Sequence, residues 1–252
     1  MTRFKKILLS LSLLILIASA GLLIFLQTKT YQASATAEKM AQEAKSVDHS
    51  LYFKAKGKME ASLIFFQGAL VEEKAYAPLA ADLAKEGIDV YLLDSPLNLA
   101  ILSGNRAKQL KDKLAHAPVY LAGHSLGGVI AAQTVEDFSK DTKGLILLAS
   151  YPSDKTDLSK KDLAVLSIRA SQDKVLNQNA YQRAKSRLPK STIYSTIDGG
   201  NHAGFGDYGK QAKDGKASIF NTQQRQEIVK SIITFIKTSK NDTQLGAVFC
   251  VI

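Results

Sequence analysis

The sequence predicts an α/β fold with a mostly parallel sheet that carries helices on both faces, preceded by one apolar N-terminal helix. Short apolar runs alternate with longer amphipathic stretches between residues 62 and 236, and this alternation is typical of βαβ units. The short runs are almost continuously apolar, which indicates strands covered on both faces. With 252 residues, 46% of them hydrophobic, the chain can bury a large core without a metal or a disulfide.

The order of these runs gives the expected elements. We expect strands at residues 62–67, 88–93, 119–122, 145–149, 164–168 and 192–197. The amphipathic stretches predict helices at residues 75–86, 105–114, 129–138, 179–188 and 223–236. Gly87 and Pro189 follow two of these stretches, as glycine and proline often do at the ends of helices. The simplest partition is one globular domain over residues 46–252.

The N-terminal segment predicts a membrane anchor. Residues 1–6 carry Arg3, Lys5 and Lys6, and residues 7–26 then run for 20 positions without a charge. A helix needs about 20 apolar residues to cross a bilayer, and the basic flank predicts a cytoplasmic N-terminus with the domain outside the cell membrane. The alternative is a signal peptide that is cleaved after the small residues 18–20 or 33–35, which would release a secreted domain. Residues 27–45 contain no glycine or proline, and we expect them to form a helical stalk.

The composition excludes several classes of function. The net charge is +10, but the lysines are scattered along the chain, which favours a solvated basic surface and no nucleic-acid partner. The single cysteine, Cys250, excludes an intramolecular disulfide framework and a cysteine metal cluster. We interpret it as part of a short apolar tail, residues 245–252. Nothing in the pattern indicates an oligomeric state.

A glycine-rich turn carries the chemistry. Residues 123–128 read GHSLGG and lie between a predicted strand and a predicted helix, which is the context of a G-x-S-x-G nucleophile elbow. Glycines let the strand and the helix approach closely, so the turn can present Ser125 as a nucleophile. The Leu126 amide then lies at a helix N-terminus, where it can hold a developing oxyanion. The alternative is a turn that only packs or binds an anion.

The order of the downstream residues supports a catalytic interpretation. An acid and then a histidine must follow the serine, each after a later strand. Of four histidines, His202 alone lies beyond the turn, and Asp173 follows the strand 164–168. Three further acids remain alternatives for the acid: Asp198, Asp154 and Asp157.

The second oxyanion donor is expected in the loop after the strand 62–67. Gln67-Gly68-Ala69 occupies that loop, and the Ala69 amide is the candidate. Gly68 is equally compatible with an ordinary turn. His124, inside the elbow, is expected to pack beneath it.

Several blocks together resemble the α/β-hydrolase superfamily, in particular its dienelactone-hydrolase-like serine hydrolases. Besides GHSLGG, these blocks are residues 73–80, 95–100, 144–152 and 200–209, and the resemblance covers residues 63–236. It implies the α/β-hydrolase fold and a Ser125–Asp173–His202 triad with no cofactor. The chain departs from the group at Gln67-Gly68-Ala69, where such proteins often have Pro-Gly-Gly.

These observations predict a membrane-anchored, extracytoplasmic serine hydrolase that cleaves a carboxylic ester, or a related acyl bond of a small molecule, through an acyl-enzyme. An acyltransferase with the same triad is one alternative. A non-catalytic, membrane-anchored binding protein on the same fold is the other.

Overall fold

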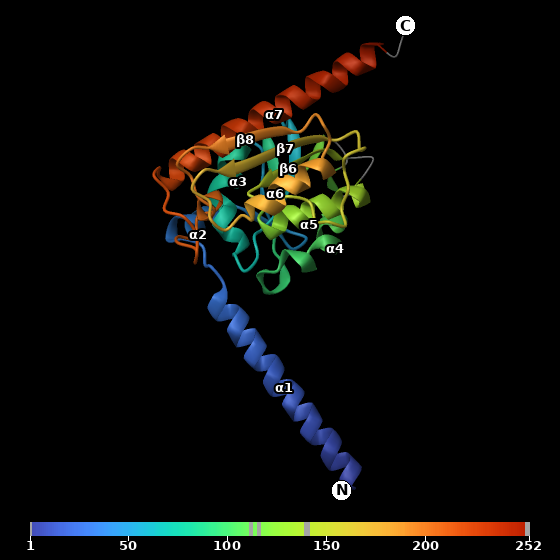
Figure 1. The fold of residues 1–252 in the computed structure, drawn as a ribbon, viewed down its shortest axis with the longest axis vertical. Helices are drawn as coiled ribbons and strands as arrows, with labels where there is room; N and C mark the ends of the chain where they lie inside the picture. The colour runs from blue at the N-terminus through green and yellow to red at the C-terminus, as the bar shows by residue number, and fades with distance from the viewer. Residues whose placement is uncertain (1, 111–112, 115–116, 139–141, 250–252) are drawn as a thin grey trace. The chain divides into compact units, whose positions relative to one another are not determined.

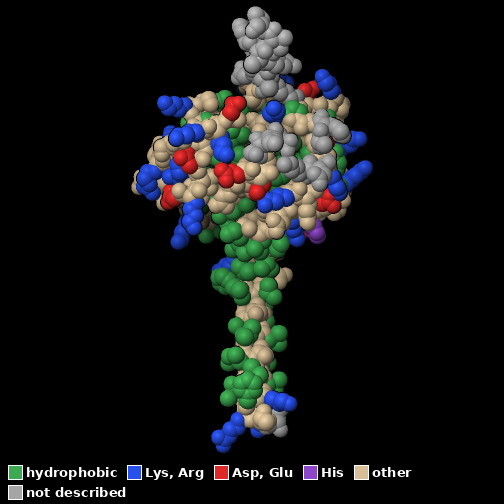
Figure 2. Space-filling model, turned by 90° about the vertical axis from the view of Figure 1, so that its right-hand side faces the viewer, with side chains coloured by type: hydrophobic (Ala, Val, Ile, Leu, Met, Phe, Trp, Pro, Cys, Tyr) green, Lys and Arg blue, Asp and Glu red, His purple; other side chains and the backbone are tan. Residues whose placement is uncertain are grey.

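The computed structural model describes residues 2–110, 113–114, 117–138 and 142–249, with the side chains of residues 240–249 left aside. The chain divides into two units, Met1–Thr30 and Tyr31–Ile252. The first unit is the helix α1 (Arg3–Lys29), which Thr2 caps and which buries none of its residues. Figure 2 shows hydrophobic side chains along this helix and basic side chains at its free end. The helix is long and apolar enough to cross a membrane, a test that a signal sequence also passes.

The second unit is built on one eight-stranded sheet in the order β1-β2-β4-β3-β5-β6-β7-β8. Figure 1 shows its strands β6, β7 and β8 side by side. The first two strands of this order pair antiparallel and β2 also pairs antiparallel with β4, while the other neighbours are parallel. The strands are β1 (Lys45–Val47), β2 (Ser50–Phe53), β3 (Ala61–Phe66), β4 (Ile88–Leu93), β5 (Val119–His124), β6 (Thr142–Leu148), β7 (Ala164–Ala170) and β8 (Ile193–Ile197). The predicted mostly parallel α/β sheet is confirmed.

Helices cover both faces of the sheet. In β3, Leu63 and Phe65 join one apolar cluster together with residues of α3 and α7, while Ile64 and Phe66 join a second cluster with residues of α4 and α5. Successive strand residues face opposite sides, which is why the central strands β3, β4 and β5 are apolar at most positions. The helices are α2 (Ala35–Ala41), α3 (Ala77–Lys85), α4 (Gly104–Leu110), α5 (Leu126–Thr134), α6 (Gln178–Ala184) and α7 (Asn221–Phe249).

Short 3₁₀ helices extend or connect these elements. They are η1 (Glu73–Tyr76), η2 (Pro96–Asn98), η3 (Ala100–Leu102), η5 (Val135–Phe138), η6 (Lys185–Arg187) and η7 (Ala203–Phe205). The 3₁₀ helix η1 overlaps the start of the predicted helix 75–86. Two others, η5 and η6, overlap the last residues of the predicted helices 129–138 and 179–188. Residues 111–112 of the predicted helix 105–114 lie outside the described residues, as does Cys250.

The segment expected to be a helical stalk, residues 27–45, has a different structure. The helix α1 ends at Lys29, and Tyr31 forms a parallel bridge with Val71. The short helix α2 then begins at the cap residue Ser34, and its Ala37 is fully buried. The stalk expectation was therefore wrong from Tyr31 onward, because small apolar side chains in this segment pack against the globular unit.

Two further differences lie at the edges of the domain. The strands β1 and β2 were not expected; they form a hairpin whose two turn residues, Asp48 and His49, have positive φ angles of 42° and 57°. The closing helix α7 runs to Phe249, beyond the expected end at residue 236 and through most of the expected apolar tail.

Candidate active site

The turn between β5 and α5 holds Ser125 in a backbone conformation that non-glycine residues rarely adopt. Its φ is 53° and its ψ is −123°, and such strain persists only where the surroundings enforce it. Two hydrogen bonds do so: the Ser125 amide donates to Leu148 O at 2.9 Å, and Ser150 Oγ donates to Ser125 O at 2.6 Å. Strained residues of this kind cluster at functional sites.

The elbow glycines allow this turn because there is no room for a side chain. A Cβ built on Gly123 would lie 2.3 Å from the backbone of Gly127, and a Cβ on Gly127 would lie 2.1 Å from Phe66 O. Both neighbours are backbone atoms, one of α5 and one of β3, so they cannot move aside cheaply. The two glycines thus hold β3, β5 and α5 together beneath Ser125.

Gly127→Ala is therefore expected to lower the free energy of unfolding by about 3 kcal/mol, as overpacking of a rigid core does. Gly104→Ala is the matched control, because a Cβ there has nothing within 4 Å. Urea unfolding of the two variants measures the difference. Equal stability of the two variants would contradict the tight packing inferred here.

Asp173 and His202 form a buried pair at the carboxyl ends of β7 and β8. The His202 Nδ1 lies 2.8 Å from Asp173 Oδ2. The other carboxylate oxygen, Asp173 Oδ1, accepts the backbone amides of Val175 at 2.8 Å and Leu176 at 2.9 Å. The acid is therefore fixed by two donors, and it in turn fixes the imidazole ring.

The second ring nitrogen of His202 is left available. Among the described residues, His202 Nε2 is buried without a hydrogen-bond partner. When Nδ1 carries the proton that it donates to the carboxylate, Nε2 carries the lone pair. A buried histidine in that tautomer has the acceptor that a general base needs.

The rival acids have other partners. Asp198 Oδ1 accepts a hydrogen bond from Ser171 Oγ at 3.0 Å. Asp154 pairs with Arg187 at 3.0 Å and is almost fully exposed, while Asp157 Oδ1 accepts the amide of Ser159 at 2.9 Å. Of the four candidate acids, Asp173 is the one that is hydrogen-bonded to His202 within the described part of the chain.

The two candidate oxyanion donors lie in the elbow and in the loop after β3. Leu126 is the first residue of α5, and Ala69 is exposed in the loop 67–72 after β3. Neither backbone amide has a hydrogen-bond partner among the described residues. The neighbouring amide of Gly68, by contrast, donates to the Tyr76 hydroxyl at 3.0 Å.

Two contributors to this site were not found from the sequence. Asp214 accepts the amide of His202 at 3.3 Å and that of Ala203 at 2.8 Å, and thereby holds the histidine loop. Tyr76, in η1, lies 2.9 Å from His124 Nδ1. No local sequence pattern marks either residue, because each acts through a contact made only in the folded protein.

His124 does more than the packing that the sequence suggested. Its ring centroid lies 4.5 Å from that of His202 and 5.5 Å from that of Phe205. Since Tyr76 accepts the Gly68 amide, its hydroxyl proton is available for His124 Nδ1. Burial, and the nearby charge of His202 when protonated, hold the pKa of His124 well below 6.5. Hydrogen bonds between neutral groups thus run from the Gly68 amide through the Tyr76 hydroxyl to the ring of His124, which lies beside the ring of His202.

This neutral histidine predicts a dependence of stability on pH. The unfolded chain titrates His124 near its usual pKa of 6.5, while the folded protein keeps it neutral, so the unfolded state binds more protons below that pH. One such group costs up to about 1.4 kcal/mol of stability per pH unit as the pH falls below 6.5. His124→Gln is expected to reduce this acid slope in urea unfolding. Phe205→Leu, a variant of the non-titrating neighbour, should keep the wild-type slope; equal slopes in all three proteins would contradict a buried neutral His124.

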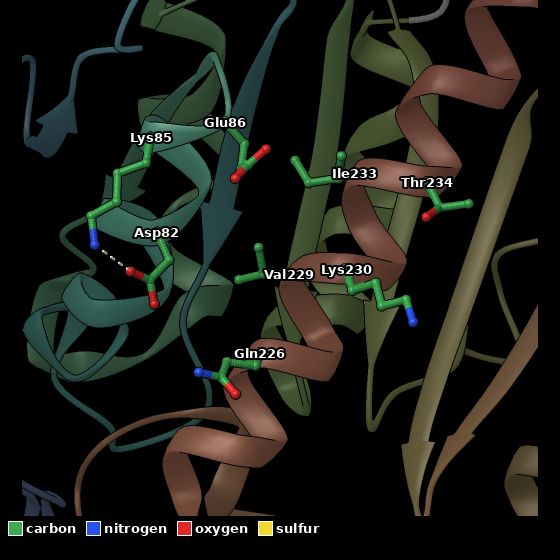
Figure 3. A pocket seen from close by; sticks show the side chains of 8 residues that line it. All are labelled: Asp82, Lys85, Glu86, Gln226, Val229, Lys230, Ile233 and Thr234. Atoms are coloured by element: carbon green, nitrogen blue, oxygen red, sulfur yellow. Dashed lines mark hydrogen bonds and ion pairs between the residues drawn. The ribbon is translucent and has the colours of Figure 1, made fainter.

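A hollow of about 450 Å³ lies between α3 and α7. Figure 3 shows the charged and polar side chains that line it, with Val229 and Ile233 from α7. Asp82, one of the two carboxylates that line the hollow, already forms ion pairs with Lys85 and Arg225. The hollow holds none of the candidate catalytic residues.

The comparisons with known proteins agree with this architecture. The model of the alpha/beta hydrolase family matches residues 62–226, which include Ser125, Asp173 and His202. The chain belongs to the alpha/beta hydrolase family. No curated protein matches it in sequence.

Solved structures share the fold of this alpha/beta hydrolase at low sequence identity. Dienelactone hydrolase from Anabaena variabilis is 15% identical, with a TM-score of 0.58, over 76% of this chain and 96% of its own. Est1E from Butyrivibrio proteoclasticus is 13% identical, with a TM-score of 0.55, over 76% and 94%. The monoglyceride lipase of Saccharomyces cerevisiae is 9% identical, with a TM-score of 0.59, over 78% and 94%. The expected hydrolase fold is confirmed, and the chain is a hydrolase of this fold.

Proposed function

We propose that this alpha/beta hydrolase cleaves a carboxylic ester through an acyl-enzyme on Ser125. His202 Nε2 takes the Ser125 proton as the hydroxyl attacks the acyl carbon, and the amides of Leu126 and Ala69 hold the oxyanion. His202 returns the proton to the leaving alcohol, and a water molecule then releases the acid. Asp173 keeps the imidazole in the required tautomer and stabilises its cation.

One observation carries this proposal. His202 is bonded through Nδ1 to a carboxylate that two backbone amides hold, and its Nε2 is buried without a partner in the described part of the chain. A buried polar nitrogen without a hydrogen-bond partner lowers the stability of the fold. A catalytic role explains why this nitrogen is retained. The name of one solved neighbour, a monoglyceride lipase, supports an ester as the substrate class.

The location belongs to the same proposal. We infer that α1 remains attached as a single membrane span, with Arg3, Lys5 and Lys6 on the cytoplasmic side and the hydrolase unit on the opposite side. Its uncharged stretch of 20 residues is longer than the roughly 7–15 apolar residues of a signal peptide. Cleavage of the helix would make the hydrolase a secreted protein.

A fluorophosphonate probe tests the nucleophile directly. The full chain in detergent is expected to form one stoichiometric adduct, which peptide mass spectrometry locates at Ser125. Ser186→Ala, which alters an exposed serine outside the site, is the matched control and should label fully. A folded wild-type protein that stays unlabelled, or that is labelled at another serine, would reject this nucleophile and favour a non-catalytic binding protein.

A further inference from the structure

Three segments of the globular unit meet at Leu70, in the loop that carries the candidate oxyanion donor. The Leu70 carbonyl accepts the amide of Tyr31 at 2.6 Å, and the Leu70 amide donates to the carbonyl of Asn98 at 2.8 Å. Leu70 has a φ of 55°, which is strained for a leucine. One residue beside Ala69 thus links the start of the globular unit to the loop after β4.

Tyr31 fixes the point at which the chain enters the globular unit. Its carbonyl accepts the amide of Glu72 at 3.1 Å, and its ring lies 5.5 Å from that of Tyr208. Only Thr30 separates it from the end of α1 at Lys29. Since a residue spans at most about 3.6 Å, Lys29 lies within about 7 Å of Tyr31 whatever direction the helix takes.

This connection limits the distance between the loop 67–72 and a bilayer that α1 would span. The uncharged stretch ends at Leu26, so Tyr31 lies no more than about 12 Å beyond the hydrocarbon layer. Headgroups occupy roughly 6 Å on each side of that layer. The segment that carries Ala69 therefore lies at the bilayer surface, independently of the angle between the two units.

A neighbouring loop exposes apolar side chains. We call residues 95–103 the apolar loop: Leu97, Ile101 and Leu102 are 45%, 64% and 48% exposed. The two ends of the loop are joined by a hydrogen bond between the hydroxyls of Ser95 and Ser103. Exposed apolar side chains gathered on one ordered loop mark a contact with a membrane or an apolar ligand more often than chance.

The apolar loop is hydrogen-bonded to the loop 67–72, which carries the candidate oxyanion donor Ala69. Besides the Leu70 bond, Gln67 Nε2 donates to Asn98 Oδ1 at 3.0 Å, so two residues of the loop 67–72 hold it. Leu97 and Asn98 have positive φ angles of 57° and 54°, a strain that ordinary loops avoid. The apolar loop is thereby held, at Asn98, by the loop that carries the candidate oxyanion donor.

We propose that the apolar loop docks on the bilayer that α1 spans, and that Ser125 takes its acyl group from a long-chain lipid ester of that bilayer. This inference rests on the proposed function. The ester C–O bond breaks as the bond from Ser125 Oγ to the acyl carbon forms, and the serine proton passes through His202 to the departing alcohol. Water then cleaves the acyl-enzyme, so one ester and one water give a fatty acid and an alcohol.

Vesicles test this proposal with the full chain. The protein is reconstituted in phosphatidylcholine vesicles that contain dioleoylglycerol, and oleate release is compared with turnover of soluble p-nitrophenyl acetate. Replacing Leu97, Ile101 and Leu102 together by serine should lower the ratio of the two rates about tenfold, because three side chains lose their apolar contact. The control replaces Met59 and Ile193 by serine. Both are exposed apolar residues near the amino ends of parallel strands, and the ratio should stay unchanged.

A spacer gives an independent measurement. Four EAAAK repeats inserted between Thr30 and Tyr31 lift the hydrolase unit by about 30 Å. Oleate release should fall at least as far as in the serine variant, while p-nitrophenyl acetate turnover stays at the wild-type level. An unchanged ratio of oleate release to p-nitrophenyl acetate turnover in both variants would overturn the inference. So would an intact protein mass showing that α1 has been removed. Absence of p-nitrophenyl acetate turnover and of fluorophosphonate labelling in the wild type would instead reject the proposed function.

Discussion

Ser125→Ala is expected to lower kcat for p-nitrophenyl acetate by about 10⁶-fold, the order of loss found when a triad nucleophile is removed. The proposed mechanism has no substitute for this hydroxyl, because it forms the covalent bond to the acyl group. Some acceleration over water should remain, since the amides of Leu126 and Ala69 can still polarise a bound ester. Steady-state rates at saturating ester measure the loss.

A second substitution separates catalysis from folding. Ser125 has a φ of 53° and a ψ of −123°, a conformation that glycine adopts at little cost. Ser125→Gly should therefore be as inactive as Ser125→Ala while keeping or raising the melting temperature. Residual turnover above about one per cent of wild type in either variant would show that another group is the nucleophile.

The central sheet could be predicted because its physics is local. A parallel strand buried on both faces is apolar at nearly every position, so β3 and β4 are visible as mostly apolar runs, SLIFF and IDVYLL. The first two strands of the sheet, β1 and β2, lack this signal: β1 is mostly exposed, and β2 is only four residues long. Their pairing depends on the turn at Asp48 and His49 and on the neighbouring β4.

The prediction of a helical stalk was wrong for a related reason. An absence of glycine and proline permits a helix but does not require one, and the break at Thr30 has no such marker. The bridge between Tyr31 and Val71 joins residues that are far apart in the sequence. A contact of this range leaves no periodic pattern, so the start of the globular unit could be read only from the fold.

The chain order of the candidate catalytic residues could be predicted from the sequence, but the residues that hold them in place could not. Chain order and the ends of strands select Ser125, Asp173 and His202 from the sequence. The contacts that hold them come from residues of no fixed spacing: Tyr76 bonded to His124, and Asp214 bonded to the His202 amide. These partners depend on how η1 and the loop after η7 fold back over the sheet edge.

Asp173→Asn gives the other large effect, with an expected loss in kcat of about 10⁴-fold, as for the corresponding substitution in a serine protease. The reason lies in the other oxygen of the carboxylate. Asp173 Oδ1 accepts two backbone amides, so the asparagine must place its oxygen there and its NH₂ group toward His202 Nδ1. His202 is then forced to accept at Nδ1 and to carry its proton at Nε2, where it cannot take the proton of Ser125.

Asparagine and alanine at position 173 should differ in an unexpected direction. Asp173→Ala leaves the tautomer of His202 unconstrained, so the isosteric asparagine should be at least as inactive as alanine, although it preserves shape better. Nitrogen-15 chemical shifts of His202 report the tautomer directly, and Asp198→Asn, at the rival acid, should retain activity within about threefold, as an exposed acid outside the site would. A more active Asp173→Asn than Asp173→Ala, or a larger loss in Asp198→Asn, would show that the carboxylate of Asp173 does not set the tautomer of the catalytic base.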